Sequence, residues 1–327
     1  MIKRKFDIVC IGLAIVDSMI RGFDPEPVIS GYRAESGSLN AGGDAVNESV
    51  ASAKLGLKTG LLTSLGRDAA GDLITDFLSA NGVSTDLIIR SDEHQTPVTT
   101  IFVLEDGNRR SITNQAHKYN FHPEKYMDMV DAKAVILGSL FRAPFNDPDV
   151  IREVLTAAKS GNMLVFADTK LPNFRTLNLD DIEDMLPMID FITPNLSEAE
   201  YYSGKTHLSD MADVFLAKGI KNVIIKLGGE GCYFKGHGIG TGDIIEKHIP
   251  AFNAETVDAT GAGDNFIAGF ASEILRGADI NDALIFANAC GAVCTTAVGA
   301  GTALRNRSQV EDFLNKAARP SSDYPQQ

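Results

Sequence analysis

Residues 258–264, Asp-Ala-Thr-Gly-Ala-Gly-Asp, place two carboxylates around a run of small residues at the start of a helical stretch. Gly261, Ala262 and Gly263 allow the backbone to turn sharply, so that the first N–H groups of the helix point outward together. Such unpaired N–H groups, at the positive end of the helix dipole, bind anions such as phosphate. Asp264 follows at once and is expected beside the bound anion.

Asp264 has two explanations. The dipole favours an aspartate at any helix start, whatever its function. Alternatively, the carboxylate takes a proton from an attacking hydroxyl while the neighbouring N–H groups hold a phosphoryl group. The spacing favours the second explanation and indicates phosphoryl transfer to a hydroxyl.

The rest of the chain alternates short apolar runs with amphipathic stretches, which is typical of a parallel sheet between helices. The apolar runs predict buried strands, and the amphipathic stretches predict helices. The predicted strands are 6–11, 60–64, 134–138, 163–167, 191–193 and 222–227, and the predicted helices are 45–55, 69–80, 149–160 and 212–217.

Two segments, 15–40 and 97–113, interrupt this alternation with patterns typical of antiparallel strands, and residues 105–108, Glu-Asp-Gly-Asn, indicate a hairpin turn. We expect them to form a small β-sheet lid. The last third is predicted to be helical at 261–276, 280–297 and 309–317. Neither a repeat nor a linker divides the chain, so one domain over residues 1–327 is expected.

Composition excludes several classes of protein. The net charge of −13 argues against binding nucleic acid through phosphate contacts. No apolar stretch is long enough to span a membrane. The four cysteines lack metal-ligand spacing and are interpreted as free thiols in a reducing cytoplasm; they are Cys10, Cys232, Cys290 and Cys294.

Residues 258–264 resemble the C-terminal signature of the ribokinase-like (PfkB) carbohydrate kinases, commonly D-T-T-G-A-G-D followed by an aromatic and small residues. Ala259, within the motif, and Asn265, directly after it, depart from this pattern. Four further segments resemble family motifs in the correct order. They are 11–17, ending in Asp17; 41–47, Ala-Gly-Gly-Asp-Ala-Val-Asn; 194–198, Pro-Asn-Leu-Ser-Glu; and 226–231, Lys-Leu-Gly-Gly-Glu-Gly, with Lys226 replacing a common threonine. The resemblance covers nearly the whole chain. It implies a three-layer α/β/α sandwich with a mostly parallel sheet, and ATP-dependent phosphorylation of a small sugar or keto-sugar.

The resemblance also implies a role for each matched residue. Asp264 is the catalytic base, and the amides of Gly261, Ala262 and Gly263 stabilise the transferring phosphoryl group. The acceptor is bound by Asp17, Gly42, Gly43 and Asn47, and ATP by Asn195, Lys226, Gly228, Gly231 and Asn288. Glu198 holds Mg²⁺ through water, and Asp258 and Thr260 mark a site for K⁺, with backbone carbonyls near Cys294, Ala297, Gly299 and Ala303.

Several of these residues also have ordinary structural explanations. Asn195 and Glu198 can cap a helix, Gly228 and Gly231 can form a β-turn, Asp17 can be a loop aspartate, and Asn288 can be a polar helix residue. The roles of Arg109, Asp168 and Arg175 stay open; the last two loosely resemble a D-x-N-x-R stretch of fructokinase-like members.

Three alternatives to a sugar kinase remain: a nucleoside kinase on the same fold, a catalytically silent nucleotide-binding regulator, and a Rossmann dehydrogenase. The dehydrogenase is disfavoured because no G-x-G-x-x-G follows the first strand. Residues 203–206, Ser-Gly-Lys-Thr, resemble the end of a P-loop, but Ala199 stands where that motif requires glycine. They are interpreted as a turn that ends a helix. A homodimer through the lid is expected, because edge strands of such lids often pair.

Overall fold

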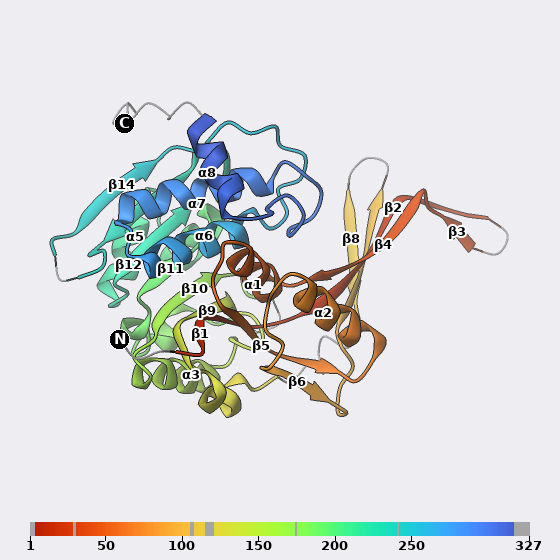
Figure 1. The fold of residues 1–327 in the computed structure, drawn as a ribbon, viewed down its shortest axis with the longest axis horizontal. Coiled ribbons are helices and arrows are strands. Elements are labelled where there is room, and N and C mark those ends of the chain that lie inside the picture. Colours follow the sequence, from red (N-terminus) through yellow and green to blue (C-terminus); the bar gives the residue numbers. More distant parts are fainter. Residues whose placement is uncertain are drawn as a thin grey trace.

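The computed structural model describes residues 4–28, 31–104, 108–114, 121–173, 175–240 and 242–316. Within these ranges the chain forms a large sheet covered by helices and a smaller sheet that projects to one side (Figure 1).

The large sheet has nine strands within the described residues, in the order β14-β13-β12-β11-β10-β9-β1-β5-β6. Strands β12 to β6 along this order are parallel, and β13 and β14 are antiparallel additions at one edge. Their bounds are β1 Phe6–Ile11, β5 Thr59–Gly66, β6 Ile88–Ser91, β9 Ala132–Leu140, β10 Leu164–Thr169, β11 Phe191–Thr193, β12 Asn222–Lys226, β13 Cys232–Gly236 and β14 Ile245–Ile249.

Helices cover both faces of this sheet because its strands are apolar on both sides. Strand β1 shows the division: Val9 and Ile11 belong to one core cluster, and Ile8 and Cys10 to the other. The first cluster includes α3 (Pro148–Ser160), α4 (Leu196–Ser203) and α5 (Leu208–Ala217). The second includes α1 (Asp44–Lys54), α2 (Ala69–Ala80), α6 (Ala262–Arg276) and α7 (Ile280–Cys294). The predicted three-layer sandwich is confirmed.

The remaining elements are short. Helix α8 (Arg307–Lys316) packs on the outside of α7 around Val310. Within the described ranges, 3₁₀ turns lie in connections at η2 Pro123–Met129, η3 Leu179–Ile182, η4 Leu186–Met188 and η5 Gly228–Glu230.

The lid is a second sheet built from the two segments predicted to form it. It contains β2 (Ile15–Val28), β3 (Gly31–Arg33), β4 (Ser36–Gly42), β7 (Val98–Leu104) and β8 (Arg109–Thr113). The expectation of antiparallel strands was wrong for one pair, because β2 and β7 run parallel. They follow β1 and β6, two parallel strands of the main sheet, at their carboxyl ends. The predicted hairpin residues 105–107 and the side chain of Arg109 lie outside the described part.

Most predicted elements are confirmed, with shifts at their ends. The predicted helix 212–217 begins earlier, at Leu208, and 280–297 ends at Cys294. Gly204 ends α4 in the left-handed conformation, which confirms the turn interpretation of residues 203–206. All four cysteines are free and buried. No helix in the described ranges combines the length and apolarity needed to cross a membrane.

Candidate active site

The N-terminus of α6 has the geometry expected of an anion-binding helix start. Gly261 precedes it with φ +78°, and a Cβ added there would lie 2.2 Å from the Cβ of Ala300. Among the described residues no side chain caps the helix, although the N–H of Ala262 already donates to the carbonyl of Ala259 at 3.2 Å. The N–H of Ala262 is therefore already engaged, as is that of Asn265, which donates to the carbonyl of Gly261 at 2.9 Å.

Asn265 holds this turn in place. The sequence alone did not indicate this role, because Asn265 departs from the family signature at this position. Its Nδ2 donates to the carbonyl oxygens of Gly261, at 2.8 Å, and Ala300, at 2.9 Å. These bonds fix the glycine turn against the loop that follows α7.

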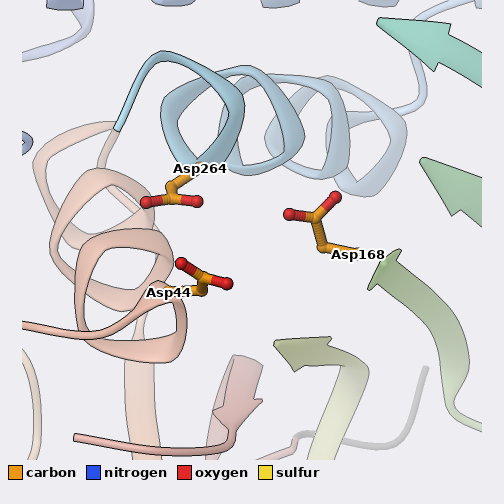
Figure 2. Close-up of side chains that lie close together, drawn as sticks. All are labelled: Asp44, Asp168 and Asp264. Carbon is orange, nitrogen blue, oxygen red and sulfur yellow. The ribbon is translucent and has the colours of Figure 1, made fainter. Parts of the chain in front are cut away.

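Three aspartates from distant segments converge beneath this turn (Figure 2). Asp264 lies in the first turn of α6, Asp44 in the first turn of α1, and Asp168 near the end of β10. One carboxylate oxygen of each lies within 4.8 Å of those of the other two. Carboxylates this close repel one another unless cations or protons compensate.

Two lysines supply positive charge to this cluster. The Nζ of Lys226 lies 2.5 Å from Oδ1 of Asp168, and the Nζ of Lys170 lies 3.3 Å from Oδ2 of Asp44. Ser139 also donates to Asp44. The cluster therefore combines proton acceptors with ammonium groups.

Asp264 has the properties of a base that works near neutral pH. Burial raises its pKa to about 7, with a further contribution from the Asp44 carboxylate, while the Lys170 ammonium acts in the opposite direction. The Nδ2 of Asn47 donates to Oδ2 of Asp264 at 2.6 Å and so stabilises the charged form. Asn47, which is predicted to bind the acceptor, also contacts the candidate base.

Glu48 is a buried carboxyl that sequence analysis did not single out. It follows Asp44 by one turn of α1, and neither oxygen has a hydrogen-bond partner among the described residues. Burial raises its pKa well above the usual range, and the nearby aspartates add to this effect. Burial and the neighbouring aspartates therefore both disfavour a charge on Glu48.

The other predicted acceptor residues lie together where the lid joins α1. A Cβ on Gly42 would lie 2.4 Å from Oδ2 of Asp17, so glycine is needed for this close approach. Gly43 begins α1 with φ +102°, where a Cβ would lie 2.4 Å from the carbonyl of Leu13. Burial raises the pKa of the half-buried Asp17.

The motif residues Asn195 and Glu198 form a reciprocal cap at the start of α4. The Asn195 side chain accepts from the Glu198 N–H, and Glu198 Oε2 accepts from the Asn195 N–H at 2.9 Å and from Thr169 Oγ1 at 2.8 Å. Burial raises the pKa of Glu198. The capping explanation is thus confirmed, and it leaves a desolvated carboxylate close to Lys226 and Asp168.

Several of the other residues predicted to bind the nucleotide or a cation make contacts within the protein. A Cβ on Gly231 would lie 2.0 Å from the carbonyl of Ile249, whereas one on Gly228 would meet nothing within 4 Å. Asn288 is buried and its Nδ2 donates to the carbonyls of Ile249, at 3.0 Å, and Pro250, at 3.2 Å. Asp258 accepts from Thr260 and from the Gly299 N–H, and so joins the loop after α7 to the start of α6.

Three residues had open roles, and the side chain of Arg109 lies outside the described part; of the other two, only Asp168 belongs to the site. Arg175 pairs with Asp147 at 3.0 Å, with about half of both side chains exposed. Lys170, two positions after Asp168, reaches the cluster instead.

Comparison with known proteins agrees with this geometry. The family model described as pfkB family carbohydrate kinase matches residues 5–307. The chain belongs to this family. It is therefore a carbohydrate kinase by family.

Two curated relatives and one solved structure show how close the similarity is. A ribokinase of Staphylococcus aureus is 30% identical over 271 residues, which cover 79% of this chain and 83% of the relative. A 2-dehydro-3-deoxygluconokinase of Bacillus subtilis is 28% identical, over 80% of this chain and 83% of the relative. The structure of Arabidopsis thaliana ribokinase complexed with ribose and ATP superposes with a TM-score of 0.79 at 24% identity, covering 94% of this chain and 98% of that one.

Proposed function

We propose that this kinase transfers the γ-phosphoryl group of ATP to a hydroxyl of a small sugar or keto-sugar, with Asp264 as the general base. The observation that carries the proposal is the position of Asp264. It is a buried carboxylate with a pKa of about 7, in the first turn of a helix whose N-terminus is capped by no side chain in the described part of the chain.

In the proposed reaction the acceptor lies between the lid and α1. Asp17 accepts hydrogen bonds from its hydroxyls, and Gly42 and Gly43 leave room for it beside the backbone. Asp264 takes the proton of the attacking hydroxyl, while Asn47 holds the carboxylate in position. The N–H groups at the start of α6 stabilise the charge on the transferring phosphoryl group. Closure of the lid over the acceptor excludes water.

The residues present fit the cations that the family implies. Glu198 offers a desolvated carboxylate close to the Asp168 carboxylate, and a hard cation prefers such oxygen ligands. Mg²⁺ held there through water, with Asn195 and Glu198, would neutralise the β- and γ-phosphate oxygens. Asp258 and Thr260 are the residues that we assign to K⁺.

A coupled ADP-release assay tests the proposal. Mg-ATP is offered with hexoses, ketoses, pentoses, deoxy-keto acids and nucleosides, each with and without K⁺. Turnover on a sugar or keto-sugar supports the proposal and identifies the acceptor. Turnover on nucleosides alone would overturn the acceptor class, and nucleotide binding without turnover on any acceptor would favour the regulator.

A further inference from the structure

Lys226 is a buried lysine whose side chain is fixed by a buried carboxylate. Its side chain is 13% exposed, and that of Asp168 is 2% exposed. The Nζ lies 2.5 Å from Oδ1 of Asp168, and the same oxygen accepts from Thr193 Oγ1 at 2.8 Å. Asp168 is therefore held from two sides, and the ammonium group has a defined position.

That position lies at the junction of the segments that resemble nucleotide motifs. The backbone N–H of Lys226 donates to the carbonyl of Pro194 at 2.8 Å, which joins β12 to the segment containing Asn195. A Cβ added to Gly263 would lie 3.2 Å from the Lys226 Nζ. The ammonium group is thus adjacent to the N-terminal turn of α6.

The ion pair is poorly explained by stability alone. A buried pair often contributes no more than apolar residues of similar volume, because both charges lose their hydration. A catalytic function accounts for it better, since a phosphoryl group entering beside three carboxylates needs compensating positive charge. Lys170 is paired with Asp44 in α1, whereas the Lys226 Nζ is the group that a Cβ on Gly263 would approach to 3.2 Å in the first turn of α6.

We propose that Lys226 is a catalytic residue, positioned by Asp168, whose ammonium group contacts the γ-phosphoryl group as it passes from ATP to the acceptor. This inference rests on the proposed function and adds a residue to it. Burial disfavours the charged form of Lys226, but the Asp168 and Glu198 carboxylates outweigh this effect and raise its pKa. These carboxylates therefore favour the charged form of the amine.

The step balances without any change at Lys226. A bond forms between the acceptor oxygen and the γ-phosphorus, and the bond from that phosphorus to the β,γ-bridging oxygen breaks. The hydroxyl proton goes to Asp264, and ADP leaves with the electron pair. Lys226 keeps its protons and donates hydrogen bonds to non-bridging oxygens of the phosphoryl group.

The test compares Lys226→Met with Lys226→Arg and with a control variant, Lys159→Met. Lys159 also pairs with a buried carboxylate, Asp190, at 2.6 Å. Asp190 precedes β11 and so lies at the amino end of the parallel strands, whereas Asp168 and Lys226 lie at their carboxyl end. Each variant is assayed for turnover, and its affinity is measured for ADP and for a non-hydrolysable ATP analogue.

We expect Lys226→Met to lower kcat by roughly 100- to 1000-fold, the effect of losing one preorganised donor. Its affinity for the ATP analogue falls by about ten-fold or more relative to its affinity for ADP, because only the analogue carries a γ-phosphate. Lys226→Arg restores part of both losses, and Lys159→Met stays within about two-fold of the wild type in both.

Two results would overturn the inference. One is an unchanged ratio of the two affinities in Lys226→Met, whatever happens to turnover; the other is an equal loss of kcat in Lys159→Met. If the wild type binds both nucleotides but phosphorylates no acceptor, the proposed function fails, and the ratio of affinities still decides whether Lys226 contacts the γ-phosphate.

Discussion

At the scale of single residues, Asp264 and its neighbours set the acidity of the site. Burial and Asp44 favour the protonated carboxyl, whereas Lys170 and the amide of Asn47 favour the carboxylate. These opposing effects give a pKa of about 7, close to the value at which a general base is most effective in neutral solution.

This balance predicts how activity depends on pH. The base must be deprotonated, so kcat/KM is expected to rise with pH and to level off above the Asp264 pKa of about 7. The midpoint is measured from kcat/KM as a function of pH, at acceptor concentrations below saturation, and it reports the pKa in the free enzyme. A profile that stays flat from well below to well above neutrality would show that Asp264 does not titrate in the rate-determining step.

Replacement of Asn47 should move this midpoint upward. Asn47→Ala removes a donor to the charged carboxylate, and a hydrogen bond to a charged group contributes about 1.5–3 kcal/mol, or roughly one to two pKa units. The same pH–rate profile is the measurement. As a control, Asn81→Ala removes a side-chain bond to the Phe77 carbonyl at the end of α2 and should leave the midpoint unchanged. A midpoint that does not move in Asn47→Ala would mean that Asn47 does not tune the base.

At the scale of elements, the start of α6 depends on glycine in two respects. Gly261 has a positive φ, and a Cβ there would collide with Ala300. At the other end of the same helix, Gly277 has φ +86° but a Cβ there would meet nothing within 4 Å. Both glycines therefore have a left-handed backbone, but an added Cβ would collide with a neighbour only at Gly261.

This pair yields a stability prediction. Gly277→Ala should lower the free energy of unfolding by about 1–2 kcal/mol, the cost of a left-handed L-residue. Gly261→Ala should cost about 1–3 kcal/mol more, because the added methyl group displaces Ala300. Urea denaturation measures both. Equal losses would show that the collision at Gly261 is relieved without cost.

Local patterns predicted most elements but not the contacts between distant segments. Strand β1 and helix α2 were predicted to the residue because apolar periodicity is a local property. The parallel pairing of β2 with β7 depends on how each segment enters the lid, which no local pattern records. The bond from Asn47 to Asp264 joins residues 217 positions apart, and that from Lys226 to Asp168 joins residues 58 positions apart. Motifs predicted Asn47, Lys226 and Asp264 as site residues, but their partners required the folded chain.

At the scale of the whole molecule, the lid exposes apolar side chains on one face. Leu39 is 61% exposed and Ile112 is 68% exposed. Leu39 pairs with Ser18, Ser18 with Thr100, and Thr100 with Ile112, so this row lies on one face of the lid. Asp17 precedes Ser18 and therefore points to the opposite face, where we propose that the acceptor binds.

We therefore predict a homodimer formed through this face of the lid. Light scattering should give about twice the chain mass of 35.1 kDa for the wild type and the single-chain mass for Leu39→Asp/Ile112→Asp. Ile239→Asp changes an equally exposed apolar residue outside the lid and should leave the dimer intact. A wild type that is monomeric at tens of micromolar would contradict this prediction.

The central claim is that Asp264 removes the acceptor's proton, and Asp264→Asn tests it most directly. The substitution keeps the shape of the side chain and removes the basic oxygen. On whichever acceptor the wild type phosphorylates, kcat should fall by about 100- to 10,000-fold, while the affinity for ADP stays within about three-fold of the wild type. An Asp264→Asn variant that binds ADP normally and keeps kcat within about ten-fold of the wild type would show that another group accepts the proton.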